Sequence, residues 1–166
     1  MFHEIDPKEL TENVFSLLDD RWTLITAGTP NHCNTMTASW GGLGVLWAQN
    51  VATIYVRPQR YTFEFLEKYP EFTLSFFTEE YRPQLTLCGT ESGRETDKVK
   101  ECGFTLCSAG ETAPYFEEAS LVLVCRKLYW HDIDPEHFLD PALPKFYSQK
   151  DYHRLYIGAI TKTLIK

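Results

Sequence analysis

Short runs rich in β-branched and aromatic residues, separated by turns and brief helical stretches, constrain the fold of this chain most. The helical stretches are too short and too irregularly placed for a doubly wound parallel sheet. The pattern therefore predicts a mostly β fold, a small closed antiparallel barrel of about six strands with short helical insertions. The predicted strands cover residues 22–27, 34–40, 51–57, 72–77, 121–129 and 155–165.

Helix and turn signals lie between these runs. Asp6-Pro7-Lys8-Glu9 combines a capping aspartate, a proline at the first helical position and a capping-box glutamate, which predicts a helix to Leu17 or Leu18. Gly41-Gly42-Leu43-Gly44 is expected to break the strand before it, and Gly158 to bend or bulge the last strand. Further short helices are predicted at 61–69, 79–87 and 96–102, the last closed by Gly103.

Length and charge exclude several classes of protein. A chain of 166 residues and 19.3 kDa is expected to form a single domain, residues 1–166. A net charge of −7 argues against nonspecific binding to nucleic acid or to an anionic membrane. No apolar run approaches the roughly 20 residues of a membrane span, and the acidic N-terminus does not resemble a signal peptide. We therefore expect a cytoplasmic protein.

Cysteine and aromatic content add two expectations. Five cysteines without a CxxC motif predict reduced, mostly buried thiols, and the absence of an HxxxH pair predicts no metal site. Aromatic residues make up 14% of the chain, and this surplus suits a planar aromatic ligand or a large dimer interface in addition to the core.

Two segments place cations at predicted helix starts, where free backbone N–H groups attract anions. Arg57, Arg60 and Thr62 lie where a strand passes into a helix, although a capped helix with two surface arginines explains the same residues. The loop 92–98 carries Ser92, Arg94 and Lys98 and is a candidate phosphate clamp. The alternative is a solvated loop, with Lys98 paired at most with Glu95 or Glu101.

Two further segments are candidates for contacts to a flat ligand. Residues 34–44 mix hydroxyls, an amide, an indole and glycines, which let a ring approach the backbone, although a hairpin turn explains the glycines equally well. His153, just before the last strand, is a candidate proton donor or ligand contact, against the alternative of an exposed loop histidine. The chain has no dinucleotide fingerprint, P-loop, GxSxG or HExxH motif.

Taken in order, the segments NTMTASWGGLGVLW, VRPQRYTFEFLEK, FTLSFF, CGTESGRETDK and DYHRLYIG resemble the flavoredoxin-type branch of the flavin reductase family. The resemblance runs from about Trp22 to Ile160. It implies a six-stranded Greek-key split β-barrel, a homodimer, and one FMN at each dimer-interface site. Glu95 stands where this branch often has Asp, and Ala159 where an acidic residue is common, which puts a polar contact from position 159 in doubt.

The resemblance also assigns roles to individual residues. It implies that NAD(P)H binds transiently as the electron donor and that His153 lies close to the flavin or nicotinamide as a catalytic candidate. The implied FMN-binding residues are a ring-facing set, a corner near the phosphate and a loop that closes on it: Asn34, Thr35, Met36, Thr37, Ser39 and Trp40; Arg57, Arg60 and Thr62; Ser92, Arg94 and Lys98.

Three functions remain open at this point. The first is an FMN-dependent NAD(P)H oxidoreductase, in which the flavin performs the redox chemistry and the protein supplies orientation and electrostatics. The second is an electron-transfer protein that keeps FMN bound and exchanges electrons with a redox protein partner. The third is a cofactor-binding or structural barrel without redox activity, which a colourless protein unable to take up FMN would favour.

Overall fold

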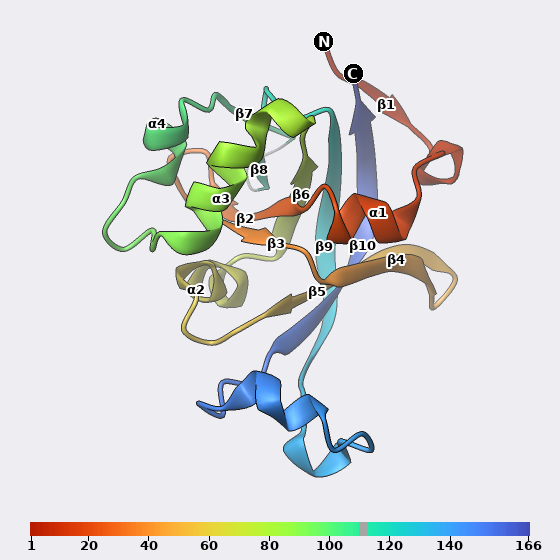
Figure 1. Cartoon of the computed structure of the whole chain (residues 1–166). Helices are drawn as coiled ribbons and strands as arrows, with labels where there is room; N and C mark the ends of the chain where they lie inside the picture. The colour runs from red at the N-terminus through yellow and green to blue at the C-terminus, as the bar shows by residue number, and fades with distance from the viewer. Residues whose placement is uncertain (110–112) are drawn as a thin grey trace.

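The computed structural model describes residues 1–109 and 113–166, and an antiparallel sheet dominates it (Figure 1). Its strands follow the order β3-β2-β6-β9-β10-β5-β4. Strand β1 pairs with the C-terminal end of β10, which does not pair with β5. The predicted mostly β, antiparallel architecture is confirmed. The strands of the sheet are β1 His3–Ile5, β2 Thr23–Thr29, β3 His32–Ala38, β4 Gly41–Leu46, β5 Gln49–Val56, β6 Glu71–Phe76, β9 Leu121–Asp132 and β10 Arg154–Ile165, and β7 Leu106–Ser108 pairs with β8 Pro114–Phe116 beside it.

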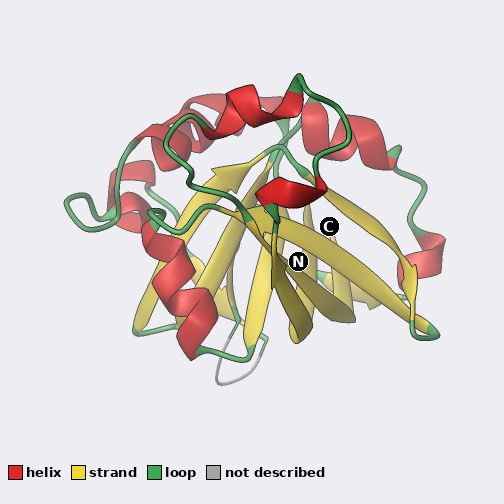
Figure 2. Cartoon of the chain, turned by 90° about the horizontal axis from the view of Figure 1, so that it is seen from below, coloured by secondary structure: helices red, strands yellow, loops and turns green. Residues whose placement is uncertain are grey.

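Short helices surround the sheet at its periphery (Figure 2). Among the described residues, none of these helices has the length and apolar character needed to cross a membrane. The α-helices are α1 Val14–Asp19, α2 Tyr61–Lys68, α3 Arg82–Thr90 and α4 Lys98–Cys102, and the 3-10 helices are η1 Pro7–Glu9, η2 Glu79–Tyr81, η3 Pro135–His137 and η4 Leu143–Tyr147.

The predicted single helix from Asp6 to Leu17 or Leu18 is wrong. The capping box forms as expected, but the turn it starts ends at Glu9, and Leu10 is extended. A second helix, α1, then starts at Asn13, whose side chain accepts hydrogen bonds from the backbone of Phe15 and Ser16. Two separate caps, at Asp6 and Asn13, therefore produce two short helices in place of one.

The strand before residues 41–44 ends as expected, at Ala38, but the glycine segment is itself a strand. These residues belong to β4, which pairs with β5 in register from Gly41↔Ile54 to Leu46↔Gln49. The hairpin turn lies at Trp47 and Ala48, which both have positive φ, 51° and 56°. Such two-residue turns usually carry Asn-Gly, so the residue types here do not indicate a turn. Together β1, β4, β7 and β8 raise the strand count of the described residues above the six predicted.

Both faces of the sheet are covered by hydrophobic cores. Successive side chains of a strand point to opposite faces, so Ile25 and Leu24 of β2 belong to different clusters. The first cluster lies between the strands and helices α1 and α2, and includes Leu17, Leu66 and Tyr156. The second lies under α3 and the β7–β8 pair. This second core fixes α3 beside β3, where the candidate site lies.

The segment between β9 and β10, residues 133–153, projects from the main body (Figure 1). Arg154 ties its base together through hydrogen bonds of 2.7 and 2.9 Å to the Asp132 carboxylate. Arg57, which follows the end of β5, binds Asp151 at 2.7 Å. These two ion pairs hold the projecting segment against the ends of β5, β9 and β10.

Gly158 provides a test of the packing at the centre of β10. The register against β9 shifts between Ile157 and Gly158, which confirms the predicted bulge. A Cβ at Gly158 would lie 2.8 Å from the Phe72 ring and 3.0 Å from the Cβ of Cys125. We expect Gly158→Ala to lower the free energy of unfolding by about 1–3 kcal/mol through overpacking, measured by urea denaturation.

Gly42→Ala is the matched control, because a Cβ at Gly42 would meet nothing within 4 Å. Its free energy of unfolding should stay within about 0.5 kcal/mol of the parent value, as for ordinary surface substitutions. Equal denaturation midpoints for the two variants would contradict this description of the β10 packing.

Candidate functional site

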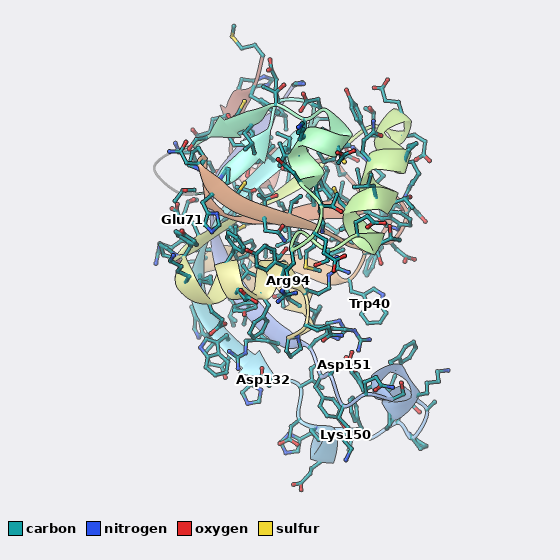
Figure 3. All side chains as sticks on the ribbon, turned by 90° about the vertical axis from the view of Figure 1, so that its left-hand side faces the viewer. Trp40, Glu71, Arg94, Asp132, Lys150 and Asp151 are labelled. Carbon is teal, nitrogen blue, oxygen red and sulfur yellow. The ribbon has the colours of Figure 1, made fainter. Side chains whose placement is uncertain are left out.

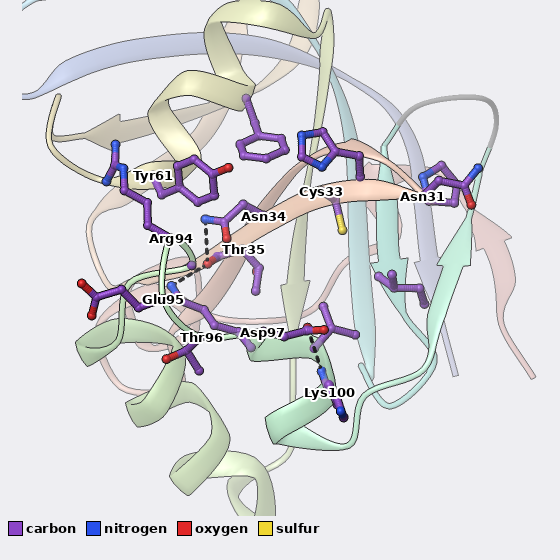
Figure 4. A pocket seen from close by; sticks show the side chains of 17 residues that line it. Asn31, Cys33, Asn34, Thr35, Tyr61, Arg94, Glu95, Thr96, Asp97 and Lys100 are labelled. Carbon is purple, nitrogen blue, oxygen red and sulfur yellow. Dashed lines mark hydrogen bonds between the residues drawn. The ribbon is translucent and has the colours of Figure 1, made fainter.

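Two adjoining cavities lie along β3, the edge strand of the sheet. The first has a volume of about 490 Å³ and lies between the start of β3, Tyr61 of α2 and residues 93–100 (Figure 4). The second, of about 170 Å³, lies between residues 36–40, the two arginines that follow β5 and His153. Of the predicted site residues, only Thr62 and Ser92 line neither cavity. The structure thus brings segments that are distant in the sequence to one strand.

Asn34 joins three of the predicted segments. Its Nδ2 donates a hydrogen bond of 2.8 Å to Oγ1 of Thr62, which is fully buried in the first turn of α2. A Cβ at Gly93 would lie only 1.9 Å from Asn34 Oδ1, so the loop 92–98 packs directly on this side chain. Thr62 therefore does not cap the helix; Arg60 is at the cap position, and no side chain caps the free N–H groups there.

The threonines of β3 use their hydroxyls within the protein. Thr35 Oγ1 lies 2.8 Å from Oγ1 of Thr26, and Thr37 donates to the carbonyl of Leu85 in α3. Met36 is buried in the first hydrophobic core. A ring lying along β3 would therefore contact mainly the strand backbone and the residues that follow the strand, Ser39 and Trp40. It would contact the three side chains described above less.

Trp40 is not a core residue, since 46% of it is exposed. Its ring lies 5.4 Å from the His153 ring and 5.8 Å from the Phe146 ring, measured between centroids. Figure 3 shows Trp40 at the edge of the main body, above the projecting segment that carries Asp151. Trp40 therefore forms a wall between the groove and that segment.

Arg60, which is half-buried, and Lys98, which is buried, form a pair of cations at the centre of the groove. Lys98 is only 5% exposed, and its Nζ donates to the carbonyls of Thr35 and Cys88, both at 2.9 Å. Arg60 donates to the carbonyls of Gly89, at 2.9 Å, and Cys88, at 3.4 Å. Both cations thus bind the C-terminal end of α3, which carries partial negative charge. The alternative of a solvated Lys98 paired with Glu95 or Glu101 is wrong.

In the part of the chain that the structure describes, the pair Arg60 and Lys98 has no carboxylate at ion-pair distance, although the charge of Glu91 acts to raise the pKa of Lys98. Burial, and secondly the charge of Arg60, lowers the pKa of Lys98 to about 8. Burial also lowers the pKa of Arg60. An anion bound beside Arg60 and Lys98 would raise both pKa values again.

The other two arginines among the predicted phosphate contacts are paired within the chain. Arg57 binds Asp151 and donates to the carbonyl of Phe146 at 3.0 Å. Arg94 lies 2.5 Å from a carboxylate oxygen of Glu64, and its guanidinium stacks 4.8 Å above the Tyr61 ring. In this structure the two arginines hold the outer walls of the groove together.

His153 is buried at the opposite end of the groove from the loop 92–98. It is 7% exposed, and its Nδ1 lies 2.8 Å from the hydroxyl of Tyr147. Burial, and secondly the charge of Arg57, lowers the pKa of His153 to about 4, against the opposing effect of Asp151. The imidazole is therefore neutral at pH 7, and it is not the exposed loop histidine of the alternative interpretation.

Sequence reasoning missed two residues of this region. Tyr147 contacts His153, but it ends the short 3-10 helix η4, whose sequence has no periodic pattern that could have indicated the contact. Cys88 contributes the carbonyl that Arg60 and Lys98 share, and a backbone acceptor cannot be inferred from the residue type.

Comparison with known proteins agrees with this arrangement. The sequence model of the flavin reductase like domain matches residues 16–165, and the chain belongs to this family.

Solved structures with low sequence identity share the fold. An FMN-binding domain of a flavin reductase-like enzyme from Shewanella baltica has a TM-score of 0.70 at 18% identity, over 99% of this chain and 77% of that one. Flavoredoxin from Methanosarcina acetivorans has a TM-score of 0.70 at 21% identity, over 98% and 76%. An NADH:FAD oxidoreductase from Streptomyces globisporus has a TM-score of 0.64 at 16% identity, over 87% and 74%. The expected split-barrel fold is thereby confirmed.

The depressed pKa of His153 predicts a specific pH dependence of stability. In the unfolded chain a histidine titrates near 6.5, whereas the folded protein holds His153 neutral down to about pH 4. The unfolded state therefore binds more protons between these values, and the contribution of His153 to stability is lost as the pH falls from 6.5 to 4. From pH 7 to pH 5 we expect a loss of about 2 kcal/mol from this group, measured by urea denaturation.

His153→Gln is the comparison, because glutamine does not titrate in this range. Between pH 7 and pH 5 the parent should lose about 2 kcal/mol more of its unfolding free energy than the variant does. Parallel pH profiles for the two proteins would show that His153 is not held neutral.

Proposed function

We propose that this chain binds FMN along β3 and passes electrons between NAD(P)H and the flavin. The observation that carries the proposal is the pair formed by the half-buried Arg60 and the buried Lys98. Among the described residues these two cations have no carboxylate partner, and they lie at the meeting point of β3, α3 and α4. A phosphate monoester supplies the dianion that this corner lacks. Family membership and the FMN-binding or flavin-dependent neighbours support a flavin as its carrier.

The residues present fit the phosphate of FMN. Lys98 has three N–H donors and uses two on Thr35 and Cys88, which leaves one for a phosphate oxygen. The N–H groups at the start of α2 have no side-chain cap, and the half-buried Ser92 lies in the adjoining loop. When bound, FMN supplies the two-electron redox chemistry, and the chain orients it.

The ring end of the site is formed by Ser39, Trp40 and His153. Tyr147 donates its hydroxyl hydrogen to Nδ1 in our proposal, which places the imidazole proton on Nε2. His153 then holds a neutral N–H donor at a buried wall of the groove, where it can stabilise negative charge on a reduced ring. The pKa near 4 makes this donor constant through the physiological pH range.

A second function is an electron-transfer protein that keeps FMN bound and exchanges electrons with a redox protein partner. The similarity to flavoredoxin from Methanosarcina acetivorans favours it. The open groove and the absence of a dinucleotide fingerprint suit either a transiently bound NAD(P)H or a docked protein. The two functions differ in steady-state turnover with NAD(P)H.

An absorbance experiment tests the proposal. The protein, loaded with FMN and freed of excess cofactor, should be yellow. Addition of NADH or NADPH without oxygen should bleach the flavin band, and air should restore it. A yellow protein that only dithionite bleaches would favour the electron-transfer function. A protein that takes up no FMN would contradict both and support a barrel without redox activity.

The Lys98 ammonium provides a direct test of the phosphate contact. A hydrogen bond to a charged group contributes about 1.5–3 kcal/mol, so Lys98→Met should weaken FMN roughly 10- to 150-fold. Riboflavin has the same ring without the phosphate, and its dissociation constant should change little. Titrations by flavin fluorescence measure both constants.

Lys100→Met is the matched control, because Lys100 lies on the same helix with an exposed side chain. It should leave both dissociation constants unchanged. Equal losses of affinity for FMN and for riboflavin in Lys98→Met would indicate that the substitution disturbs the contacts of Lys98 with β3 and α3. That result would contradict the phosphate contact.

We also propose a homodimer. Val45 and Trp47, at the β4–β5 turn, are 72% and 55% exposed. Trp47 contacts the half-exposed ring of Tyr129, with 6.1 Å between centroids, so the apolar surface extends onto β9. An exposed apolar cluster of this kind is typical of a protein interface.

Sedimentation equilibrium of the FMN-loaded protein should give about twice the chain mass of 19.3 kDa. Trp47→Ser should shift the distribution toward the monomer, because truncating a central aromatic residue removes a large share of interface energy. A 19.3 kDa species carrying FMN in the parent protein would contradict the dimer.

A further inference from the structure

Two cysteines face each other beside Arg60 and Lys98. Cys88, on α3, is fully buried, and Cys102, the last residue of α4, is partly exposed. Their Sγ atoms lie 3.7 Å apart. Cys88 also contributes the carbonyl that accepts from Lys98 and Arg60. This contact therefore sits directly behind the proposed phosphate corner.

The local geometry permits a bond between these sulfurs. A disulfide requires a separation of about 2.05 Å, so the two atoms need to approach by less than about 2 Å. Cys102 ends a five-residue helix, and Gly103 follows in the left-handed conformation with φ 67°, in open space where a Cβ would meet nothing within 4 Å. A small movement of this helix end brings the sulfur to Cys88 without disturbing the sheet.

We propose that Cys88 and Cys102 form a reversible disulfide when the protein meets hydrogen peroxide. Cys102, the more accessible thiol, loses its proton, and its sulfur attacks a peroxide oxygen; the O–O bond breaks, giving a sulfenic acid and water. Cys88 then loses its proton and attacks the Cys102 sulfur, whose S–O bond breaks to release a second water. Two thiols and one peroxide thus give one disulfide and two waters, and a dithiol reverses the change by exchange.

The oxidant has a local source if the chain is a flavin reductase, so this part rests on the proposed function. Oxygen takes two electrons and two protons from reduced flavin and becomes hydrogen peroxide. Burial raises the pKa of both thiols, to about 12 for Cys88, so only a small fraction is thiolate at neutral pH and the reaction is slow. The pair would therefore respond to sustained turnover in air and not to traces of peroxide.

The disulfide would close a ring that contains the proposed phosphate loop. Ser92, Arg94 and Lys98 all lie between Cys88 and Cys102 in the chain. Fixing both ends of this segment restricts its freedom to open. The cysteine pair thereby links the oxidation history of the protein to the loop that holds the cofactor.

Peptide mass mapping under non-reducing conditions tests the disulfide itself. The FMN-loaded protein is first reduced with dithiothreitol, freed of it, and treated with millimolar hydrogen peroxide. We expect a cross-linked peptide pair joining Cys88 to Cys102, lighter by two hydrogens than the separate peptides and restored by dithiothreitol. Cys102→Ser removes one of the two sulfurs and should abolish this peptide pair, whereas Cys107→Ser, at a partly exposed thiol on β7, should leave its yield unchanged.

Sulfinic acid at Cys102 without a cross-link, or cross-links that persist between other cysteines in Cys102→Ser, would overturn the inference. A second arm replaces added peroxide with NADH in air, with and without catalase. A disulfide with peroxide but none with NADH would leave the cysteine pair established and count against the proposed NADH-driven activity. The two failures are therefore distinguishable.

Discussion

A single buried ammonium group connects the elements on which the candidate site depends. Lys98, at the first position of α4, reaches Thr35 on the edge strand β3 and Cys88 at the end of α3 with hydrogen bonds of equal length, 2.9 Å. An edge strand exposes unpaired backbone groups, and a helix end leaves carbonyls without partners. Lys98 donates to one carbonyl of each kind and thereby holds β3, α3 and α4 together beside the groove.

The same contact explains why the groove suits an anion. Arg60 approaches the α3 carbonyls from the other side, and the two cations share the carbonyl of Cys88. Burial disfavours both charges, and within the described residues no carboxylate pairs with either. By contrast, Arg57 and Arg94 have carboxylate partners at 2.7 and 2.5 Å and define the walls. An anionic ligand would therefore be stabilised most beside Arg60 and Lys98, and the neutral His153 lies at the other end of the groove.

Much of this arrangement could be predicted from the sequence, because periodic patterns and helix caps are local. The six main strands, α2 and the bulge at Gly158 follow from such patterns. The hairpin at Trp47 and Ala48 could not be found, since these residues rarely adopt left-handed turns. The site residues were grouped by resemblance, but their pairing was not visible: whether a lysine faces solvent or two carbonyls depends on tertiary contacts between elements far apart in the chain.

We propose that FMN binds along β3 with its phosphate beside Lys98, and hydrogen exchange measured by mass spectrometry can locate the bound cofactor. Exchange is compared for the protein with FMN and without it. With FMN bound we expect slower exchange in peptides covering β3, the first turn of α2 and residues 92–98, with the β7–β8 pair unchanged. Protection that spares β3 and the 92–98 loop while FMN is bound would show that the cofactor lies elsewhere.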